Sequence, residues 1–212
     1  PGSGATVVVT VTLQNCGGCT LGPVGVSVTP TMNVRAVGAG PSVEMPTLRP
    51  GDSASLRLEL AAASVNKPHK LKSSIKYEAS GEGAPAAPVT LACELLLPCS
   101  ALMVAKDIGP DEFHSLLANA ACPHLSSTVV EGGGRPFKYT VQLLSMLLNL
   151  RLVEGTEGSA GLYACSLQGH HVTVLAKAKA GSTVSVELRS SDEVLGTQLI
   201  NEVSALPLFI SL

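Results

Sequence analysis

Tryptophan is absent from this 212-residue chain, and aromatic residues make up only 3% of it. Charged residues are also scarce, at 14%, and the formal net charge is −2. So balanced a charge does not match the basic surface of a nucleic-acid-binding protein or the composition of an acidic tail. Hydrophobic residues make up 45% of the chain, which excludes a disordered protein and indicates one or two folded domains.

The sequence also lacks long apolar runs. A helix that crosses a bilayer needs about 20 apolar residues. The longest candidates lie near 95–97 and 143–150, and proline or polar residues interrupt both. Residues 1–4 have neither the charged start nor the apolar core of a signal peptide, and we interpret them as a cloning remnant. We therefore expect a protein that is neither secreted nor membrane-spanning.

Six cysteines are few and scattered for this length, whereas disulfide scaffolds concentrate them in short chains. We therefore expect reduced thiols in a cytosolic protein. Cys16 and Cys19 have the spacing of a redox pair or of half a zinc site. Zinc would need two further ligands, and the nearest cysteines, Cys93 and Cys99, flank a predicted strand end. We expect these cysteines to be structural, and we expect no metal and no cofactor.

The first hundred residues follow the pattern of an antiparallel β-sandwich. Short β-prone segments alternate with turns that contain proline or glycine, without a helical period among them. Strands are expected at 5–14, 24–29, 43–45, 53–60, 70–79 and 89–97. In the clearest strand, Leu56, Leu58 and Leu60 would face the core while the residues between them face water. The sequence therefore predicts an immunoglobulin-like sandwich over 1–98.

After Pro98 the pattern changes to helices that alternate with strands. Amphipathic helices are expected at 111–121, at 139–150 and again after Ser191. Strands are expected at 151–154, 162–167, 171–178 and 183–188. The fold class is therefore α+β, with a small platform subdomain over 99–212 whose helices are expected to pack on one face of an antiparallel sheet.

Two of these helices carry more detailed predictions. In the helix at 139–150, Leu143 and Met146 widen the apolar stripe, which predicts burial around much of its circumference. The last helix is expected to have Ser191 as its N-cap and to end at Pro207. Its buried stripe is expected to comprise Val194, Leu195, Leu199 and Val203.

The remaining motifs favour structural roles over catalysis. Residues 132–135 resemble a phosphate loop but lack its GK[ST] ending, and Pro136 follows them. His170 and His171 are adjacent at the start of a strand, so they would point to opposite faces and would not share a metal. No serine or cysteine has the pattern of a nucleophile elbow. We therefore expect no catalytic residues and no enzyme.

A local run of lysines precedes and enters the strand at 70–79. Its even spacing from Lys70 to Lys76 places these side chains on one strand face, which we interpret as a solvated surface. An acidic partner or lipid head groups are the alternative. The members of this run are Lys67, Lys70, Lys72 and Lys76.

A sandwich followed directly by a small α+β domain resembles the C-terminal appendage, or ear, of the large subunits of clathrin-adaptor-type vesicle coats. The segment 162–172, Leu-Tyr-Ala-Cys-Ser-Leu-Gln-Gly-His-His-Val, is similar to the ear of the delta subunit of the third adaptor-protein complex. Further similarity is found at Leu175, Lys177, Ser185, Val186, Ser191, Asp192 and Leu195. The architecture covers nearly the whole chain, and the similarity is sharpest near its end.

This resemblance implies a noncatalytic interaction module on a coat that sorts membrane cargo toward lysosomes, vacuoles and related organelles. It implies partners among the other adaptor subunits, notably the small sigma subunit, and among accessory or tethering proteins. The expected location is cytoplasmic and peripheral on Golgi, endosomal or vesicle membranes. An intramolecular regulator, which binds the complex's own small subunit and limits recruitment by a small GTPase, is the alternative.

Well-known ears bind peptides in aromatic pockets that often contain tryptophan. This chain has no tryptophan and only six aromatic residues. We therefore expect protein contacts elsewhere on the platform sheet, at Tyr163, His170, His171 and Lys177. A short peptide loses conformational entropy when it binds, so it must be held at a few anchors. The expected site is a shallow apolar groove rimmed by charge.

Overall fold

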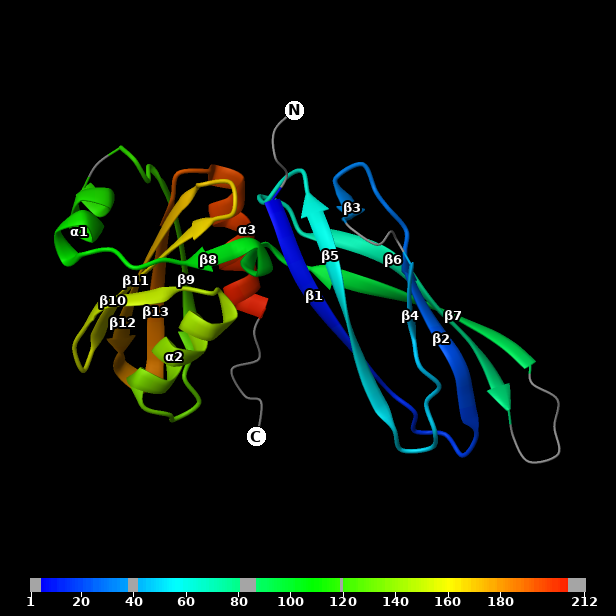
Figure 1. Ribbon diagram of the computed structural model, residues 1–212. Helices are drawn as coiled ribbons and strands as arrows, with labels where there is room; N and C mark the ends of the chain where they lie inside the picture. The colour runs from blue at the N-terminus through cyan, green and yellow to red at the C-terminus, as the bar shows by residue number, and fades with distance from the viewer. Residues whose placement is uncertain (1–4, 38–41, 81–86, 119, 206–212) are drawn as a thin grey trace. The chain divides into compact units, whose positions relative to one another are not determined.

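The computed structural model describes residues 5–37, 42–80, 87–118 and 120–205, and Figure 1 shows their arrangement. The chain divides into two compact units. The unit that we call the sandwich comprises Pro1–Ala63 and His69–Leu97, and the unit that we call the platform comprises Ser64–Pro68 and Pro98–Leu212. The fold is α+β, as the sequence predicts.

Two antiparallel sheets form the sandwich, in which we find seven strands among the described residues. One sheet has the order β1-β5-β3, and the other has the order β4-β2-β6-β7. The bounds are Ala5–Gln14 (β1), Thr20–Val28 (β2), Val34–Ala36 (β3), Ser42–Met45 (β4), Ser53–Ala62 (β5), His69–Ser80 (β6) and Ala87–Leu97 (β7). Leu56, Leu58 and Leu60 of β5 are buried, which confirms the predicted inward face of that strand.

A single antiparallel sheet forms the centre of the platform. Its strand order is β10-β11-β12-β13-β9, and β8 pairs with the end of β11. The strands are Met103–Ala105 (β8), His124–Glu131 (β9), Arg151–Gly155 (β10), Ser159–Ser166 (β11), His171–Lys179 (β12) and Thr183–Ser190 (β13). The helices are Pro110–Ala118 (α1), Phe137–Leu147 (α2) and Glu193–Ala205 (α3).

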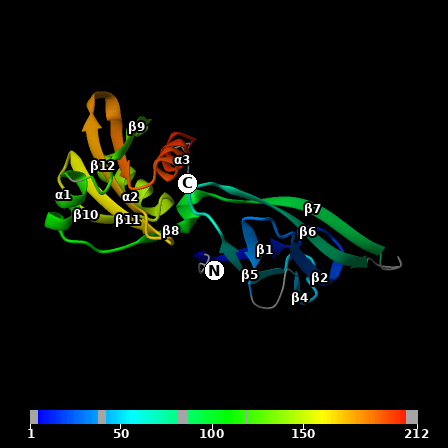
Figure 2. The same ribbon diagram turned by 90° about the horizontal axis from the view of Figure 1, so that it is seen from above.

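The helices of the platform cover both faces of its sheet, so the prediction that they pack on one face is wrong. We call the face that packs on α2 and α3 the inner face, because Leu144 of α2 and Leu199 of α3 share one core with Leu162 and Val174 of the sheet. Helix α1 lies on the other side, the outer face, as Figures 1 and 2 show.

A glycine allows α1 to approach the outer face closely. Phe113 of α1 is completely buried and lies against Gly161 of β11. A Cβ atom at position 161 would lie 2.7 Å from the Phe113 ring, which is closer than real contacts allow. A glycine in the interior of a strand often marks such a close approach.

The burial predicted around much of α2 is also wrong. Val141 and Leu144 are buried against the sheet, but Met146 is 78% exposed and Leu147 is 38% exposed. Only the side of the helix that faces the sheet is covered, so the widened apolar stripe does not indicate burial here.

The N-cap of α3 is Asp192 rather than Ser191. The backbone N–H of Leu195 donates to Oδ1 of Asp192 at 2.8 Å, while Oγ of Ser191 accepts from the N–H of His171 at 2.9 Å. Val194 is 42% exposed and is not part of the buried stripe. The predicted helix end at Pro207 lies outside the described residues.

The segment Ser64–Pro68, between β5 and β6, belongs to the platform although the strands on either side belong to the sandwich. The Nδ2 group of Asn66 donates to Oδ2 of Asp192 at 3.3 Å, and Val65 is completely buried. Asp192 therefore binds this segment with one carboxylate oxygen and caps α3 with the other.

A buried thiol lies where the platform resumes after β7. Cys99 is completely buried, and its backbone N–H donates to Glu202 at 2.7 Å. Burial, together with the negative charges of Glu202 and Asp192, raises the pKa of the Cys99 thiol from 9.0 to about 12. The folded chain therefore holds the proton over a pH range in which the unfolded chain releases it.

This difference predicts that the platform loses stability at alkaline pH. Between the unfolded pKa of 9.0 and the folded pKa of about 12, the free energy of unfolding should fall as pH rises. The loss is at most about 1.4 kcal/mol per pH unit. Cys99→Ala should remove this part of the pH dependence, as measured by denaturant unfolding below and above pH 9.0. Cys93→Ala, which removes an exposed thiol, is the control, and an unchanged slope in Cys99→Ala would contradict the prediction.

Candidate functional site

The outer face of the platform sheet carries three of the four predicted contact residues. His171 and Lys177 lie on this face of β12, because alternate residues of a strand face the same side. Tyr163 of β11 lies on the same face, opposite Thr173 of β12. His170 lies in the turn before β12. The four residues therefore lie on or next to one sheet, and the geometry of each residue decides what it can contact.

Tyr163 is buried, with 1% of its surface exposed. Its hydroxyl oxygen lies 2.7 Å from Nδ1 of His171 and 2.9 Å from Sγ of Cys165. Burial, followed by the hydrogen bond to Cys165, raises the pKa of Tyr163 above its usual value of 10.0, so the hydroxyl stays protonated. A side chain this deeply buried cannot contact a partner directly, and its role here is to hold the imidazole of His171.

His170 is held by the turn that joins β11 to β12. The buried Oγ of Ser166 accepts from the N–H groups of Gln168 and His170, at 3.3 and 3.0 Å. The turn passes through Gly169, whose φ of 88° lies in the left-handed region that favours glycine. His170 is therefore half-buried at a defined position at the end of the sheet.

Lys177 is exposed but lies far from the histidines. Six residues of strand separate it from His171, which corresponds to roughly 20 Å. Thr173, between them, is completely buried. On the neighbouring strand β11, the ring of Phe113 from α1 packs against Gly161 on this face. The structure therefore does not bring the four predicted residues into one site.

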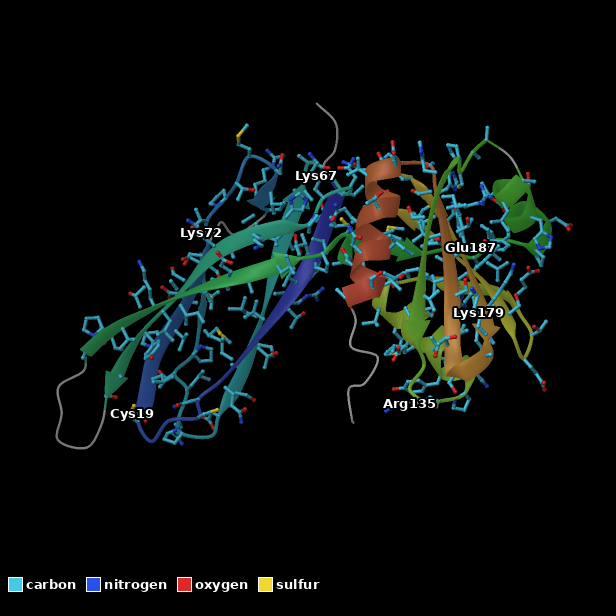
Figure 3. All side chains as sticks on the ribbon, turned by 180° about the vertical axis from the view of Figure 1, so that it is seen from behind. Cys19, Lys67, Lys72, Arg135, Lys179 and Glu187 are labelled. Atoms are coloured by element: carbon cyan, nitrogen blue, oxygen red, sulfur yellow. The ribbon has the colours of Figure 1, made fainter. Side chains whose placement is uncertain are left out.

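Beyond α1, apolar side chains are exposed on the outer face. Leu125 and Val129 of β9 are 55% and 54% exposed, and Leu175 of β12 is half-buried. Arg189 pairs with Leu125, and Glu187 pairs with Leu175. Figure 3 labels Glu187 on this part of the sheet. We define the outer-face patch as Leu125, Val129, Leu175, Lys177, Glu187 and Arg189.

Sequence reasoning missed the contribution of β9 to this patch, because no strand was predicted over His124–Glu131. Serines occupy two positions of the segment, which weakens the hydrophobic alternation. The run Thr128–Val130 is β-branched throughout and is the signal that could have indicated a strand. In the register of the sheet, Glu187 lies between Leu175 and Ser127, and Arg189 lies beside Leu125, so the patch mixes apolar and charged side chains.

The cysteine pair Cys16 and Cys19 lies in the loop between β1 and β2. The buried Asn15 shapes this loop, because its Nδ2 group donates to the carbonyls of Cys19 and Leu48 at 2.8 and 3.1 Å. Cys16 is exposed and Cys19 is half-buried. Over the described ranges, no group of three or more histidine, cysteine, aspartate or glutamate residues is placed to hold a metal ion.

The structure also describes the glycine-rich loop at 132–135 and the lysines of β6. Gly132 donates its N–H to the carbonyl of Ser182 at 2.8 Å, and the Arg135 guanidinium lies 4.4 Å from the centre of the Tyr139 ring. The lysines of β6 are exposed, and Figure 3 labels Lys72 among them. In the part of the chain that the structure describes, no helix combines the length and apolar character needed to cross a bilayer.

An antiparallel sandwich followed by an α+β platform is the architecture that the resemblance to adaptor-complex appendages predicts. Residues 100–207 match the family model described as the AP3 Mu C-terminal domain, and the chain belongs to this family.

Two relatives from the AP-3 complex add to the comparison. The chain is 28% identical over 203 residues to AP-3 complex subunit delta-1 of Bos taurus, a match that covers 93% of the chain and 17% of that protein. It is 26% identical over 113 residues to AP-3 complex subunit delta of Dictyostelium discoideum, covering 52% of the chain and 10% of that protein. The chain thus spans a small part of the length of these relatives, and its resemblance to the delta subunit is confirmed.

Proposed function

We propose that this chain is a noncatalytic protein-interaction appendage of an AP-3-type adaptor complex. The observation that carries the proposal is the similarity to AP-3 complex subunit delta-1, which extends over 93% of the chain. The exposed outer-face patch supports it, because an appendage needs an accessible surface on a rigid scaffold.

The proposed partners are the other subunits of the adaptor complex, notably its small sigma subunit, and accessory or tethering proteins. The proposed location is the cytoplasm, peripheral on Golgi, endosomal or vesicle membranes as part of the coat. In this role the chain would help to sort cargo toward lysosomes, vacuoles and related organelles.

The outer-face patch is our proposed contact surface on the platform. Leu125, Val129 and Leu175 would be its apolar contacts, on either side of Glu187, and their burial would contribute most of the binding free energy. Lys177 and Arg189 would lie at its rim, where charges set orientation and association rate more than affinity. His170 and His171 would form a second contact on the other side of α1, with Tyr163 holding the imidazole of His171 in place.

We expect Leu125→Asp combined with Val129→Asp to reduce recovery of the small sigma subunit and of tethering proteins by at least about tenfold. Each aspartate would place an unpaired charge where the partner covers an apolar surface, which is costly. Lys177→Glu, a rim change, should reduce recovery by only about threefold. The measurement is quantitative affinity purification of the assembled complex that carries each variant in its full-length subunit.

Met146→Asp is the matched control, because Met146 is 78% exposed on α2, which packs on the inner face. It should leave recovery unchanged, and circular dichroism should show that all variants fold. If the wild-type and double-variant complexes recover the partner proteins equally, the outer-face patch is not their contact surface. Selective loss of the sigma subunit together with increased membrane recruitment would favour the intramolecular-regulator alternative.

A further inference from the structure

Among the described strands of the sandwich, one sheet has one strand more than the other, and the described residues leave an apolar surface of the extra strand uncovered. Inward-facing residues of β7 pair with inward-facing residues of β6, as Leu95 does with Leu71 and Leu91 does with Ile75. Leu71 is 1% exposed, whereas Leu91 is 48% exposed and Cys93 is also exposed. The described residues of the three-stranded sheet therefore do not cover the middle of β7.

Strand β1 ends the three-stranded sheet with an unprotected edge. Within the described strands it pairs with β5 and has no second neighbour. Its ten residues, ATVVVTVTLQ, include no charge, no proline and no glycine. Natural proteins usually protect an edge strand by making it short or by giving it charges, proline or a bulge. The other sandwich edges have such protection, because β3 has three residues, β4 has four, and β7 contains Pro88 and Glu94.

The free edge of β1 and the uncovered face of β7 border the same opening. Leu13 of β1 and Leu91 of β7 line one cavity of about 310 Å³, together with Ile75 and Tyr77 of β6. The inward residues Val7, Val9 and Val11 of β1 are half-buried, whereas their partners Leu60, Leu58 and Leu56 on β5 are buried. Among the residues that the structure describes, none fills the position for one further strand beside β1.

We propose that an extended peptide segment of a partner protein docks in this position, pairs with β1 through its backbone and completes the sheet. The backbone groups along the edge are free to pair with an added strand, as in other complexes formed by strand addition. The walls provide leucine, isoleucine and valine side chains, so alternate residues of the peptide must be aliphatic. A charged residue there would be buried without a partner.

This geometry favours a single strand over a helix or a second copy of the chain. A helix satisfies its own backbone hydrogen bonds and leaves the edge unpaired. A second copy that paired antiparallel through β1 would bring its own β7 toward the β7 of the first copy, since β7 is the extra strand in each. The docking position lies on the sandwich, so the experiment that tests it is independent of the one that tests the outer-face patch on the platform.

The test measures binding of a fluorescein-labelled peptide with alternating threonine and valine, flanked by lysines, to the full chain. Fluorescence anisotropy should show saturable binding, and hydrogen exchange should show new protection of amides in β1. Leu91→Lys should weaken binding by at least about tenfold, because it places a charge on the covered face of β7. Leu96→Lys is the matched control, since Leu96 lies on the same strand, is 62% exposed and faces the opposite side.

Several outcomes would overturn the proposal. These are no binding at millimolar peptide, equal losses in the two lysine variants, and unchanged affinity for a peptide with methylated alternate backbone nitrogens. A chain that forms dimers by sedimentation, with Val8→Lys restoring the monomer, would assign the edge to a second copy instead. Leu91 and Leu96 are both exposed, so neither lysine variant is expected to prevent folding.

Discussion

Phe113→Ala is expected to lower the free energy of unfolding of the platform by about 3–5 kcal/mol. Among the described residues of α1, Phe113 alone is buried, so this ring holds the helix to the outer face. Its loss leaves a cavity over Gly161 and removes the main apolar contact of α1. Chemical denaturation measures the loss, and hydrogen exchange should show the amides of α1 unprotected while those of β12 stay protected.

A second substitution tests the contact itself. Gly161→Ala alone should cost about 1–3 kcal/mol, because its Cβ would overlap the Phe113 ring. In combination with Phe113→Leu the cost should be less than the sum of the two single changes, since the smaller side chain relieves the overlap. Strict additivity would show that the two residues do not interact.

The corresponding substitution in the sandwich is Leu60→Ala, expected to cost about 2–5 kcal/mol. Leu60 is completely buried at the centre of its sheet, between Val7 of β1 and Ala36 of β3. We propose that the sequence-based subdomains, 1–98 and 99–212, unfold in separate transitions. Leu60→Ala should then lower the sandwich transition in calorimetry and leave the platform transition in place.

Val8→Ala is the control for this substitution, because Val8 is on the exposed side of β1, at 42% exposure. Surface substitutions of this kind usually change stability by about 0.5 kcal/mol or less. A single transition that Leu60→Ala and Phe113→Ala shift to the same extent would refute separate unfolding.

Strands with strict alternation could be predicted from the sequence, because alternation follows from burial on one face. The bounds predicted for β1, 5–14, match those found, and β5 differs only at its end. Strands β3, β8 and β9 were not predicted. The three residues of β3 and of β8 are too few for a period, and serines interrupt the pattern of β9.

The burial of Tyr163 illustrates what alternation cannot reveal. A period of two residues assigns His171 and Lys177 of β12 to one face of the sheet, and in the structure Tyr163 of β11 lies on that face too. It does not reveal that α1 covers one part of that face and leaves another part open. That difference depends on the approach of Phe113 to Gly161, two residues 48 positions apart in the chain, and no local pattern encodes such a distance.

The segment Ser64–Pro68 has a consequence for any truncated form of this protein. A fragment that starts at residue 98 retains the platform sheet and its helices but discards a pentapeptide that the platform incorporates. Asp192 would then lose the amide of Asn66, and the fragment would lack the buried side chain of Val65. A deletion that removes the sandwich up to residue 97 should therefore destabilise the platform that it retains. Adding the pentapeptide Ser64–Pro68 as a separate synthetic peptide should restore part of that stability.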